Sequence, residues 1–291
     1  MQPSFAPRVL GSTQLPVGPL GLGSSFGLPA AGVERAFERG VSFFLYGSIR
    51  RASFGVGLKN LARTHRSDMV IAIQTYTRAA WMMRYGVDRA RKQLNTDYVD
   101  VLTLSWWNAP PPARIVDAAL ELKARGKVRH LMLSSHHRPS FEAAIDGDTF
   151  DALMVRYNAA HPGAEREVFP HLARRRPGIV SFTATRWGTL LKPELAPRGE
   201  ATPRASDCYR FGLTNPNVDV SLAGPKDDAQ LDEALVALEK GPMSDDELAW
   251  MRRVGSHVRA ETSKGARVSP MDLVDRATRL FRCAPKALPS P

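Results

Sequence analysis

Residues 98–135 read YVDVLTLSWWNAPPPARIVDAALELKARGKVRHLMLSS and contain one complete strand–helix–strand unit. Two short apolar runs, 98–104 and 128–134, have the length and residue types of buried strands. Between them, 113–125 carries apolar residues at helical spacing, and Gly126 ends the helix. This order is typical of two parallel strands joined by a crossover helix.

The same unit recurs about eight times along the chain. Further strands are predicted over 17–23, 41–45, 69–73, 150–155, 179–183 and 218–222, with a helical pattern after each. Right-handed crossovers repeated eight times close a parallel sheet into a barrel. An open doubly wound sheet is the alternative, but its glycine-rich turn, G-x-G-x-x-G, is not matched by LGLGSSFG at 20–27. The sequence therefore predicts an α/β protein with a (β/α)8 TIM barrel.

Both ends of the chain add to the barrel. Gly11-Ser12 lies between two short apolar runs, which predicts an N-terminal β-hairpin. A helix is predicted over 245–254, where Ser244 and Glu247 form a capping box. We expect the barrel domain to cover 1–255, and 256–291 to be a partly flexible C-terminal extension.

Composition excludes several classes of protein. The chain has 291 residues, 43% hydrophobic and 24% charged, which are globular values. No apolar run reaches the roughly 18–20 residues that span a bilayer, and the first residues lack the pattern of a signal peptide. Two cysteines, Cys208 and Cys283, are too few for a metal cluster or a disulfide framework. The expectation is a cytoplasmic protein with no metal site and no membrane contact.

The net charge of +11 has two interpretations. One is an acidic partner, either nucleic acid or a cofactor that carries phosphates. The other is a solvated basic surface. The basic residues are spread along the chain, and no basic arm with interleaved aromatic residues is present. This distribution argues against a dedicated nucleic-acid-binding module.

A TIM barrel carries its active site at the carboxyl ends of its strands. The residues that follow the predicted strands are polar and aromatic, as a small-molecule pocket requires. They are Gly23, Tyr46, Gln74, Ser105, Trp106, Trp107, Ser134, Ser135, His136, Arg156 to Asn158, Thr185, Arg186, Gly224, Pro225 and Lys226.

The order and spacing of several motifs resemble the aldo/keto reductase superfamily. RVLGSTQLPVGPLGLG (8–23) is similar to the N-terminal hairpin and first strand of that family, and LNTDYVDVLTL, GKVRHLMLSS and FDALMVRYN resemble its fourth, fifth and sixth strands. AGPKDDAQLDEAL (223–235) resembles its last strand and cofactor helix. The resemblance covers roughly residues 8–240 and implies a barrel that uses NADP(H) to reduce a carbonyl substrate.

The resemblance also implies four catalytic residues, an aspartate, a tyrosine, a lysine and a histidine. Gln74 stands where the family has the lysine, and Ser105 where it has the histidine. The loop that carries the aspartate and the tyrosine is shortened, which leaves Tyr46 as the candidate proton donor. A phenol has a pKa near 10 and is helped as an acid by a nearby cation, which Gln74 does not supply.

Substitute helpers are available in the sequence near the strand ends. Candidate cations are Arg78, Arg156, Arg186 and the Arg50-Arg51 pair, and His136 and His137 are candidate proton relays.

On the cofactor side, the resemblance places Lys226 at a phosphate, beside the start of a helix whose dipole favours an anion. Gly224 belongs to the same motif, and Gln230 and Glu233 match adenine-contacting positions. Ser134 and Ser135 match a Ser-Asn pair that holds the nicotinamide amide, and Met154 replaces a glutamine there. NADP(H) is the predicted cofactor, with flavin as the alternative.

Three functions follow from these observations. The first is an NADP(H)-dependent oxidoreductase acting on a carbonyl or alcohol with non-standard catalytic residues. The second is a catalytically inactive NADP(H)-binding barrel that serves as a sensor or interaction protein. The third, nucleic-acid binding, rests on net charge alone.

Overall fold

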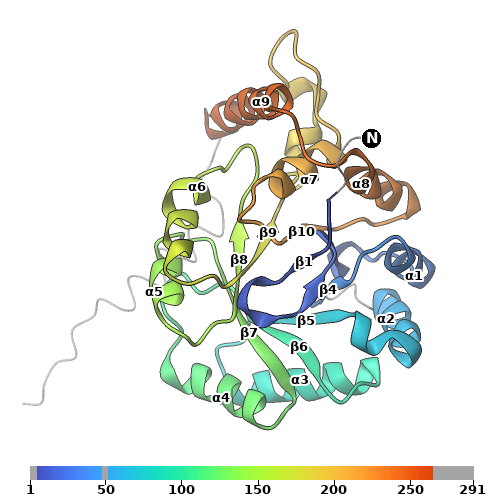
Figure 1. Cartoon of the computed structure of the whole chain (residues 1–291), viewed down its shortest axis with the longest axis vertical. Coiled ribbons are helices and arrows are strands. Elements are labelled where there is room, and N and C mark those ends of the chain that lie inside the picture. The colour runs from blue at the N-terminus through green and yellow to red at the C-terminus, as the bar shows by residue number, and fades with distance from the viewer. Residues whose placement is uncertain (1–4, 48–51, 265–291) are drawn as a thin grey trace, which may run out of the picture.

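A computed structural model describes residues 5–47 and 52–264 of this chain. Its centre is a closed barrel of eight parallel strands (Figure 1). The barrel strands are β3 (Leu20–Gly23), β4 (Phe43–Tyr46), β5 (Val70–Thr75), β6 (Val99–Leu104), β7 (Val128–Ser135), β8 (Ala152–Arg156), β9 (Gly178–Phe182) and β10 (Val220–Ala223). Strand β10 pairs with β3 and closes the sheet, so the predicted (β/α)8 architecture is confirmed.

Helices surround the barrel and alternate with its strands. They are α1 (Ala30–Glu38), α2 (Ala52–His65), α3 (Ala80–Leu94), α4 (Ala113–Ala124), α5 (Ser140–Asp146), α6 (Ala164–Glu167), α7 (Ala205–Thr214) and α8 (Asp228–Lys240). The single helix predicted after β8 is broken into α6 and a 3-10 helix, Phe169–Ala173. Pro170 lies at this break, and a proline has no N–H with which to continue an α-helix.

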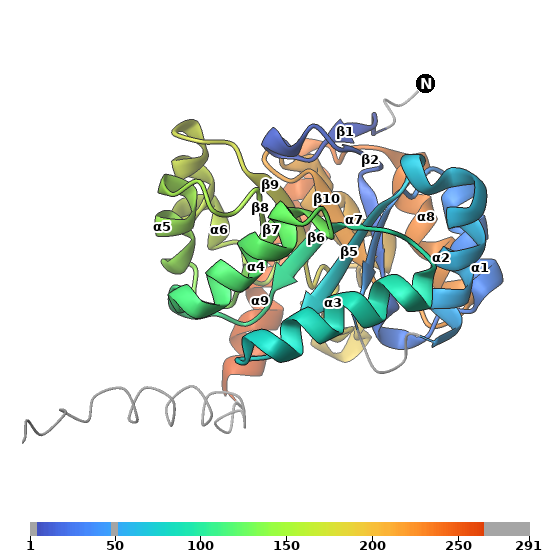
Figure 2. The same ribbon diagram turned by 90° about the horizontal axis from the view of Figure 1, so that it is seen from below.

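The predicted N-terminal hairpin is confirmed and covers the amino end of the barrel. Strands β1 (Arg8–Val9) and β2 (Pro16–Val17) pair antiparallel (Figure 2). Leu10 and Val17 are buried in the cluster that fills the barrel. Gly11 has φ +49°, and a Cβ there would lie 2.2 Å from the nitrogen of Gly178, so glycine lets the hairpin close against β9.

Side chains alternate between two apolar layers, as they must along a strand. Along β4, Phe43 and Leu45 belong to the cluster inside the barrel, whereas Phe44 and Tyr46 belong to the larger cluster between the barrel and its helices. This alternation decides which strand-end residues face the mouth.

Three aspartates make the same kind of contacts at the amino end of the barrel. Asp100, Asp151 and Asp219 each accept a backbone N–H from the preceding strand, at 2.8, 2.9 and 2.7 Å respectively. Each also pairs with a basic side chain: Arg66 contacts Asp100, Lys123 contacts Asp151 and Arg176 contacts Asp219.

These aspartates differ in their pKa. Burial raises the pKa of Asp100 and of Asp219. Burial also acts to raise the pKa of Asp151, but hydrogen bonds from His130, the Leu131 N–H and Lys123 outweigh it and lower that pKa to about 2. Asp100 lies at the amino end of β6, opposite the end at which TIM barrels carry their active site.

The last described helix, α9 (Asp245–Lys264), is twice as long as the predicted 245–254 segment. Val254 and Val258 are both buried, so the apolar face continues beyond the expected boundary at residue 255. That boundary falls inside a continuous helix, and the division into a barrel domain and an extension stays a prediction. The rest of the predicted extension, 265–291 with Cys283, lies outside the described residues. Within the described ranges, every helix is too short or too polar to cross a bilayer.

Candidate active site at the barrel mouth

The inner wall of the barrel mouth is formed by side chains near the carboxyl ends of the strands. Leu45, Met154 and Phe182 belong to the cluster inside the barrel and line this end. Ser105 and Ser134 are almost fully buried. Gln74 lies two residues after Ala72, which points inward, and therefore shares its face of β5.

An arc of aromatic rings extends over the ends of four strands. Tyr76 contacts Trp106 edge-on at 6.0 Å between centroids, Trp106 lies 6.0 Å from the His136 ring, and His136 meets Phe182 edge-on at 5.4 Å. Such offset and edge contacts are the favourable arrangements of aromatic rings. The arc forms an apolar wall suited to a flat or hydrophobic small molecule.

Arg78 fixes the loop that follows β6. Its guanidinium lies 3.8 Å from the centroid of Trp107 and donates to the carbonyl oxygens of Trp106, at 2.6 Å, and Ser105, at 3.3 Å. Trp106 has φ +64°, a conformation that is costly for a bulky residue. The strained tryptophan is therefore held by an arginine that the sequence suggested only as a substitute cation.

Tyr46 does not face the mouth. Its hydroxyl donates to Oε1 of Gln93 at 3.2 Å, and its ring packs on Gly55 of α2, where a Cβ would come within 2.9 Å of the phenol oxygen. The ring is buried between the barrel and the helices. This placement turns the phenol away from the mouth, where the predicted proton donor would act. The reason is the alternation of β4, which points Leu45 inward and Tyr46 outward.

Gln74 and Ser105 lie at the predicted end of the barrel and bring no charge to it. Gln74 packs against Gly47, where a Cβ would be 2.6 Å from the glutamine Cβ. The hydroxyls of Ser105 and of Thr103, two residues earlier on the same strand, are buried and have no hydrogen-bond partner among the described residues. A buried hydroxyl without a partner costs free energy, so these two groups mark a place where a ligand or water would be stabilised.

The two serines after β7 have different roles. Ser134 pairs in register with Met154 and faces the mouth. Ser135 instead organises the following loop, because its hydroxyl contacts Asn108 Oδ1 at 3.2 Å and accepts the His137 N–H at 2.9 Å. Of the predicted pair, Ser134 is thus positioned to touch a ligand, and Ser135 supports the loop that carries His136.

The predicted phosphate region lies after β10. The Lys226 side chain is 62% exposed, and its Nζ is 3.9 Å from Asp227 Oδ2. Asp227 is the N-cap of α8 and accepts the Gln230 N–H at 2.9 Å, while Gln230 Oε1 accepts the Lys226 N–H. A Cβ on Gly224 would meet the Phe26 ring at 2.7 Å. The cation and helix N-terminus are present as predicted, but an aspartate already caps the helix.

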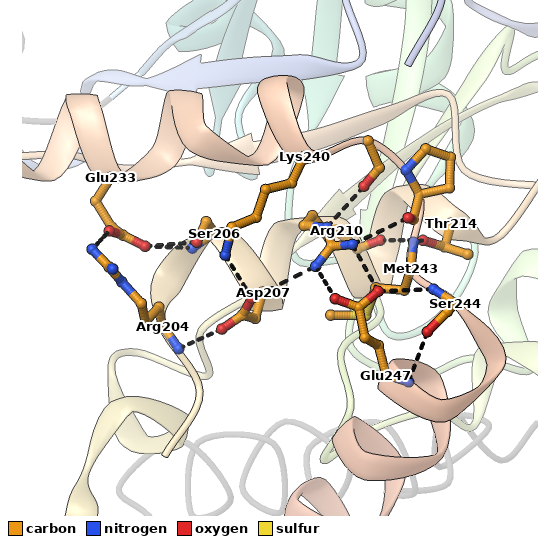
Figure 3. Close-up of polar contacts among 12 residues, drawn as sticks. Arg204, Ser206, Asp207, Arg210, Thr214, Glu233, Lys240, Met243, Ser244 and Glu247 are labelled. Atoms are coloured by element: carbon orange, nitrogen blue, oxygen red, sulfur yellow. Dashed lines mark hydrogen bonds and ion pairs between the residues drawn. The ribbon is translucent and has the colours of Figure 1, made fainter. Parts of the chain in front are cut away.

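Glu233 is held by α7 rather than by an open adenine site. It accepts from the Ser206 hydroxyl at 2.7 Å and from the Arg204 guanidinium (Figure 3). Burial acts to raise the pKa of Glu233, but the hydrogen bonds from Ser206 and Arg204 outweigh it and hold that pKa below its usual value. The predicted contact of Glu233 with adenine would have to compete with these bonds.

The remaining predicted helpers have different partners. Arg186 donates to the carbonyl of Val258 at 3.2 Å. His137 Nδ1 lies 3.0 Å from the Ser140 hydroxyl, so this imidazole points along its own loop. Arg50 and Arg51 lie outside the described residues. Of the two predicted relays, His136 is therefore the one that belongs to the aromatic arc.

Sequence reasoning named Arg156 and Arg186 as candidate cations but missed His161, on which both of their charges act. His161 follows β8 and is held by Asn158, whose Oδ1 accepts the His161 N–H at 2.9 Å. Burial, followed by the charges of Arg156, Arg186, Arg259 and Arg138, lowers the pKa of His161 to about 3. These arginines are far apart in sequence, so no local pattern could have brought them together.

A separate surface hollow of about 620 Å³ lies at the other end of the barrel. It is lined by Asp88, Arg91, Lys92, Asn95, Thr96, Asp97 and Lys127. Asp97 and Lys127 immediately precede β6 and β7, so this hollow is at the amino ends of the strands, where barrels place stability rather than chemistry. Throughout the described ranges, histidine, cysteine and acidic side chains do not gather in threes as a metal site would need.

Known proteins show the same architecture. The chain is 25% identical over 279 residues to L-galactose dehydrogenase from Arabidopsis thaliana, covering 79% of this chain and 87% of that protein. An aldo-keto reductase from Bacillus halodurans in its holo form aligns with a TM-score of 0.72 at 18% identity, covering 85% of this chain and 95% of the other. An aldo/keto reductase from Klebsiella pneumoniae in complex with NADP and acetate gives 0.71 at 20% identity, with the same coverage.

At such identities the solved structures establish the fold. The family itself is shown by residues 28–207, which match the aldo/keto reductase family over more than half of the chain. The predicted family resemblance is confirmed, and this chain belongs to the aldo/keto reductase family.

Proposed function

We propose that this protein is an NADP(H)-dependent oxidoreductase that acts on a carbonyl or alcohol at the barrel mouth, with His136 in place of Tyr46 as the proton donor. The observation that carries the proposal is the position of His136 in the aromatic arc, edge-on to Phe182 at the inner rim of a barrel of this family. NADPH, when bound, supplies the hydride that reduces the carbonyl carbon.

The described residues fit a nicotinamide dinucleotide in part. The Ser105 hydroxyl, which is buried with no hydrogen-bond partner among the described residues, and the buried Ser134 offer polar groups at the inner end, where an amide could bind. Lys226 offers an exposed cation between β10 and the start of α8, where a phosphate could bind. Asp227 and the bonds to Glu233 weaken this outer end, so we expect modest affinity for NADPH rather than tight binding.

The reaction needs a proton donor near the substrate oxygen. Reduction of a carbonyl adds a hydride to carbon and a proton to oxygen. The described inner wall offers Leu45, Gln74 and Ser105, which do not titrate near neutral pH. Histidine side chains ordinarily titrate near pH 6.5 and can both give and take a proton. His136 would donate to the carbonyl oxygen and be reprotonated from the mouth, while the aromatic arc orients the substrate and limits water.

The experiment compares His136→Gln with Tyr46→Phe in assays of NADPH oxidation against a panel of aldehydes and quinones. Loss of a general acid typically costs about 100- to 10,000-fold in kcat. We expect His136→Gln to fall in that range and Tyr46→Phe to stay within about twofold of the wild type, because the Tyr46 phenol contacts Gln93 outside the barrel. The reverse pattern would overturn the assignment of His136.

A second candidate function is an inactive NADP(H)-binding barrel. The uncharged inner wall, Leu45, Gln74 and Ser105, is the observation that favours it. Titration with NADPH followed by cofactor fluorescence separates the two: saturable binding without turnover on any carbonyl in the panel would favour the inactive barrel. Absence of NADPH binding would count against both.

A further inference from the structure

The charges of four arginines from different elements act on His161, beside the mouth. Arg138 follows β7, Arg156 ends β8, Arg186 follows β9, and Arg259 lies on α9. Arg156 pairs in register with Phe182, the inner end of the aromatic arc, so the group adjoins the candidate active site.

The approach of α9 explains how Arg259 reaches this place. A Cβ on Gly255 would lie 2.3 Å from the carbonyl carbon and oxygen of Ala159, so only glycine permits the helix backbone to pack this closely on the loop after β8. Arg259 is one helical turn further along the same face as Gly255, and His161 is two residues after Ala159. The helix and the loop thus bring these two side chains together.

The segment after β9 is shaped to deliver Arg186 to the same place. Arg186 and Trp187 have φ of +51° and +56°, which non-glycine residues adopt only when the surrounding structure holds them. The Arg186 guanidinium donates to the carbonyl of Val258, the residue before Arg259, at 3.2 Å. Backbone strain of this kind is concentrated at functional sites.

The charges at this place repel one another. Burial, followed by the charge of Arg259, lowers the pKa of Arg186. His161 is kept neutral at physiological pH by burial and by all four arginines. Glu167 accepts from Arg138 at 2.8 Å, and this hydrogen bond, followed by charges that include that of Arg259, lowers the pKa of Glu167. One carboxylate thus faces two of the four arginines. Nε of Arg138 is buried and has no hydrogen-bond partner in the described part of the chain. Gathering like charges is unfavourable unless an anion neutralises them.

We propose that Arg138, Arg186 and Arg259 form a binding site for an oxyanion, the carboxylate or phosphate group of a small acidic ligand, at the β8–β9 side of the barrel mouth. Guanidinium groups match the geometry of both oxyanions with paired hydrogen bonds. That this ligand is the substrate rests on the proposed function, whereas the existence of the site does not.

The test is calorimetric titration of the full-length protein, without cofactor and at low ionic strength, with inorganic phosphate and in parallel with acetate. We expect saturable binding at one site, weakened about tenfold or more in Arg259→Gln and in Arg186→Gln. Arg89→Gln on α3 removes the same charge from an exposed helix position away from the site and should leave binding unchanged. Tighter binding of phosphate than acetate would indicate a phosphorylated ligand, and the converse a carboxylic acid.

Several outcomes would overturn the site. One is no phosphate or acetate binding at tens of millimolar, and another is equal weakening by Arg89→Gln. Displacement of phosphate by NADPH, with Arg259→Gln weakening NADPH to the same extent, would assign the arginines to the cofactor instead. Thermal melts of each variant check folding. Turnover without oxyanion binding would support the proposed function and rule out this site. Oxyanion binding without turnover would support this site and count against the proposed function.

Discussion

At the scale of single residues, the direction of a side chain decides its role here. Tyr46 and Leu45 are neighbours at the end of β4, and the strand repeat of two points the leucine inward and the phenol outward. The Tyr46 phenol therefore points away from the mouth, although the residue directly follows the predicted strand 41–45. Conversely, His136 owes its place in the mouth to the loop that Ser135 and Asn108 hold.

His161 provides a prediction at this scale, on pH dependence. Its pKa in the folded protein is about 3, against about 6.5 for an unfolded histidine. Between these values the unfolded chain binds a proton that the folded chain does not, so stability falls as the pH drops below 6.5. From pH 7 to pH 5 the wild type should lose up to about 2 kcal/mol more than His161→Gln.

The measurement is urea unfolding of both proteins at pH 7 and pH 5. The same substitution at the exposed His65 provides the control. Equal losses of stability in the wild type and His161→Gln would show that this imidazole is not held neutral by its surroundings.

At the scale of elements, the three aspartates tie neighbouring strands at the amino end of the barrel, and one of them gives a prediction. Asp219 is nearly buried, accepts the Ile179 N–H and pairs with Arg176. Breaking a buried pair leaves the other charge poorly compensated, so Asp219→Asn should destabilise the protein by about 2–4 kcal/mol. Asp146→Asn removes an exposed pair with Arg174 and should cost less than about 1 kcal/mol. Chemical denaturation measures the free energy of unfolding of both variants. Similar losses would show that the buried aspartate contacts at the amino end do not stabilise the barrel more than an exposed ion pair does.

The docking of α9 gives a second prediction at this scale, from two helical glycines. Gly255→Ala places a methyl group against the Ala159 carbonyl and should destabilise the protein by about 1–3 kcal/mol. Gly86→Ala on α3 meets nothing within 4 Å and should stabilise it by about 0.5–1 kcal/mol. Thermal unfolding shows whether each substitution lowers or raises the stability of the protein. A neutral Gly255→Ala would mean that α9 does not need this close approach.

At the scale of the whole molecule, α9 is joined to the barrel by a buried arginine. Arg210 on α7 is 3% exposed, binds both oxygens of Glu247 at 2.6 and 2.8 Å, and donates to the carbonyl of Gly241 at 2.8 Å (Figure 3). One guanidinium thus connects α7, the end of α8 and the start of α9. This junction fixes the start of the helix that carries Arg259.

Replacing this arginine should loosen the junction. Arg210→Gln is expected to cost about 2–4 kcal/mol and to speed hydrogen exchange in α9 more than in the barrel strands. Arg253→Gln on α9 is the control, because it removes only an exposed pair with Glu200. It should change the stability and the hydrogen exchange of α9 little. Uniform exchange across the chain would show that α9 and the barrel unfold as one unit without local opening.

The sequence alone determined the barrel, the hairpin and the family. Eight apolar strands alternating with helices fix the sheet because each strand has to be buried on both faces, and this requirement is local and periodic. The sequence also placed four candidate residues at the carboxyl end of the barrel, because they lie at or just after the ends of predicted strands. They are Lys226, Gln74, Ser105 and Ser134.

Only the tertiary structure decided which of these side chains reach the mouth. The capture of Glu233 by α7 and the gathering of arginine charges around His161 depend on contacts between residues that are distant in the sequence. Hydrogen bonds and charge interactions act over a few ångströms of space regardless of sequence distance. Strand periodicity could therefore predict the scaffold, whereas the site required the packing of α7, α9 and the strand-end loops against one another.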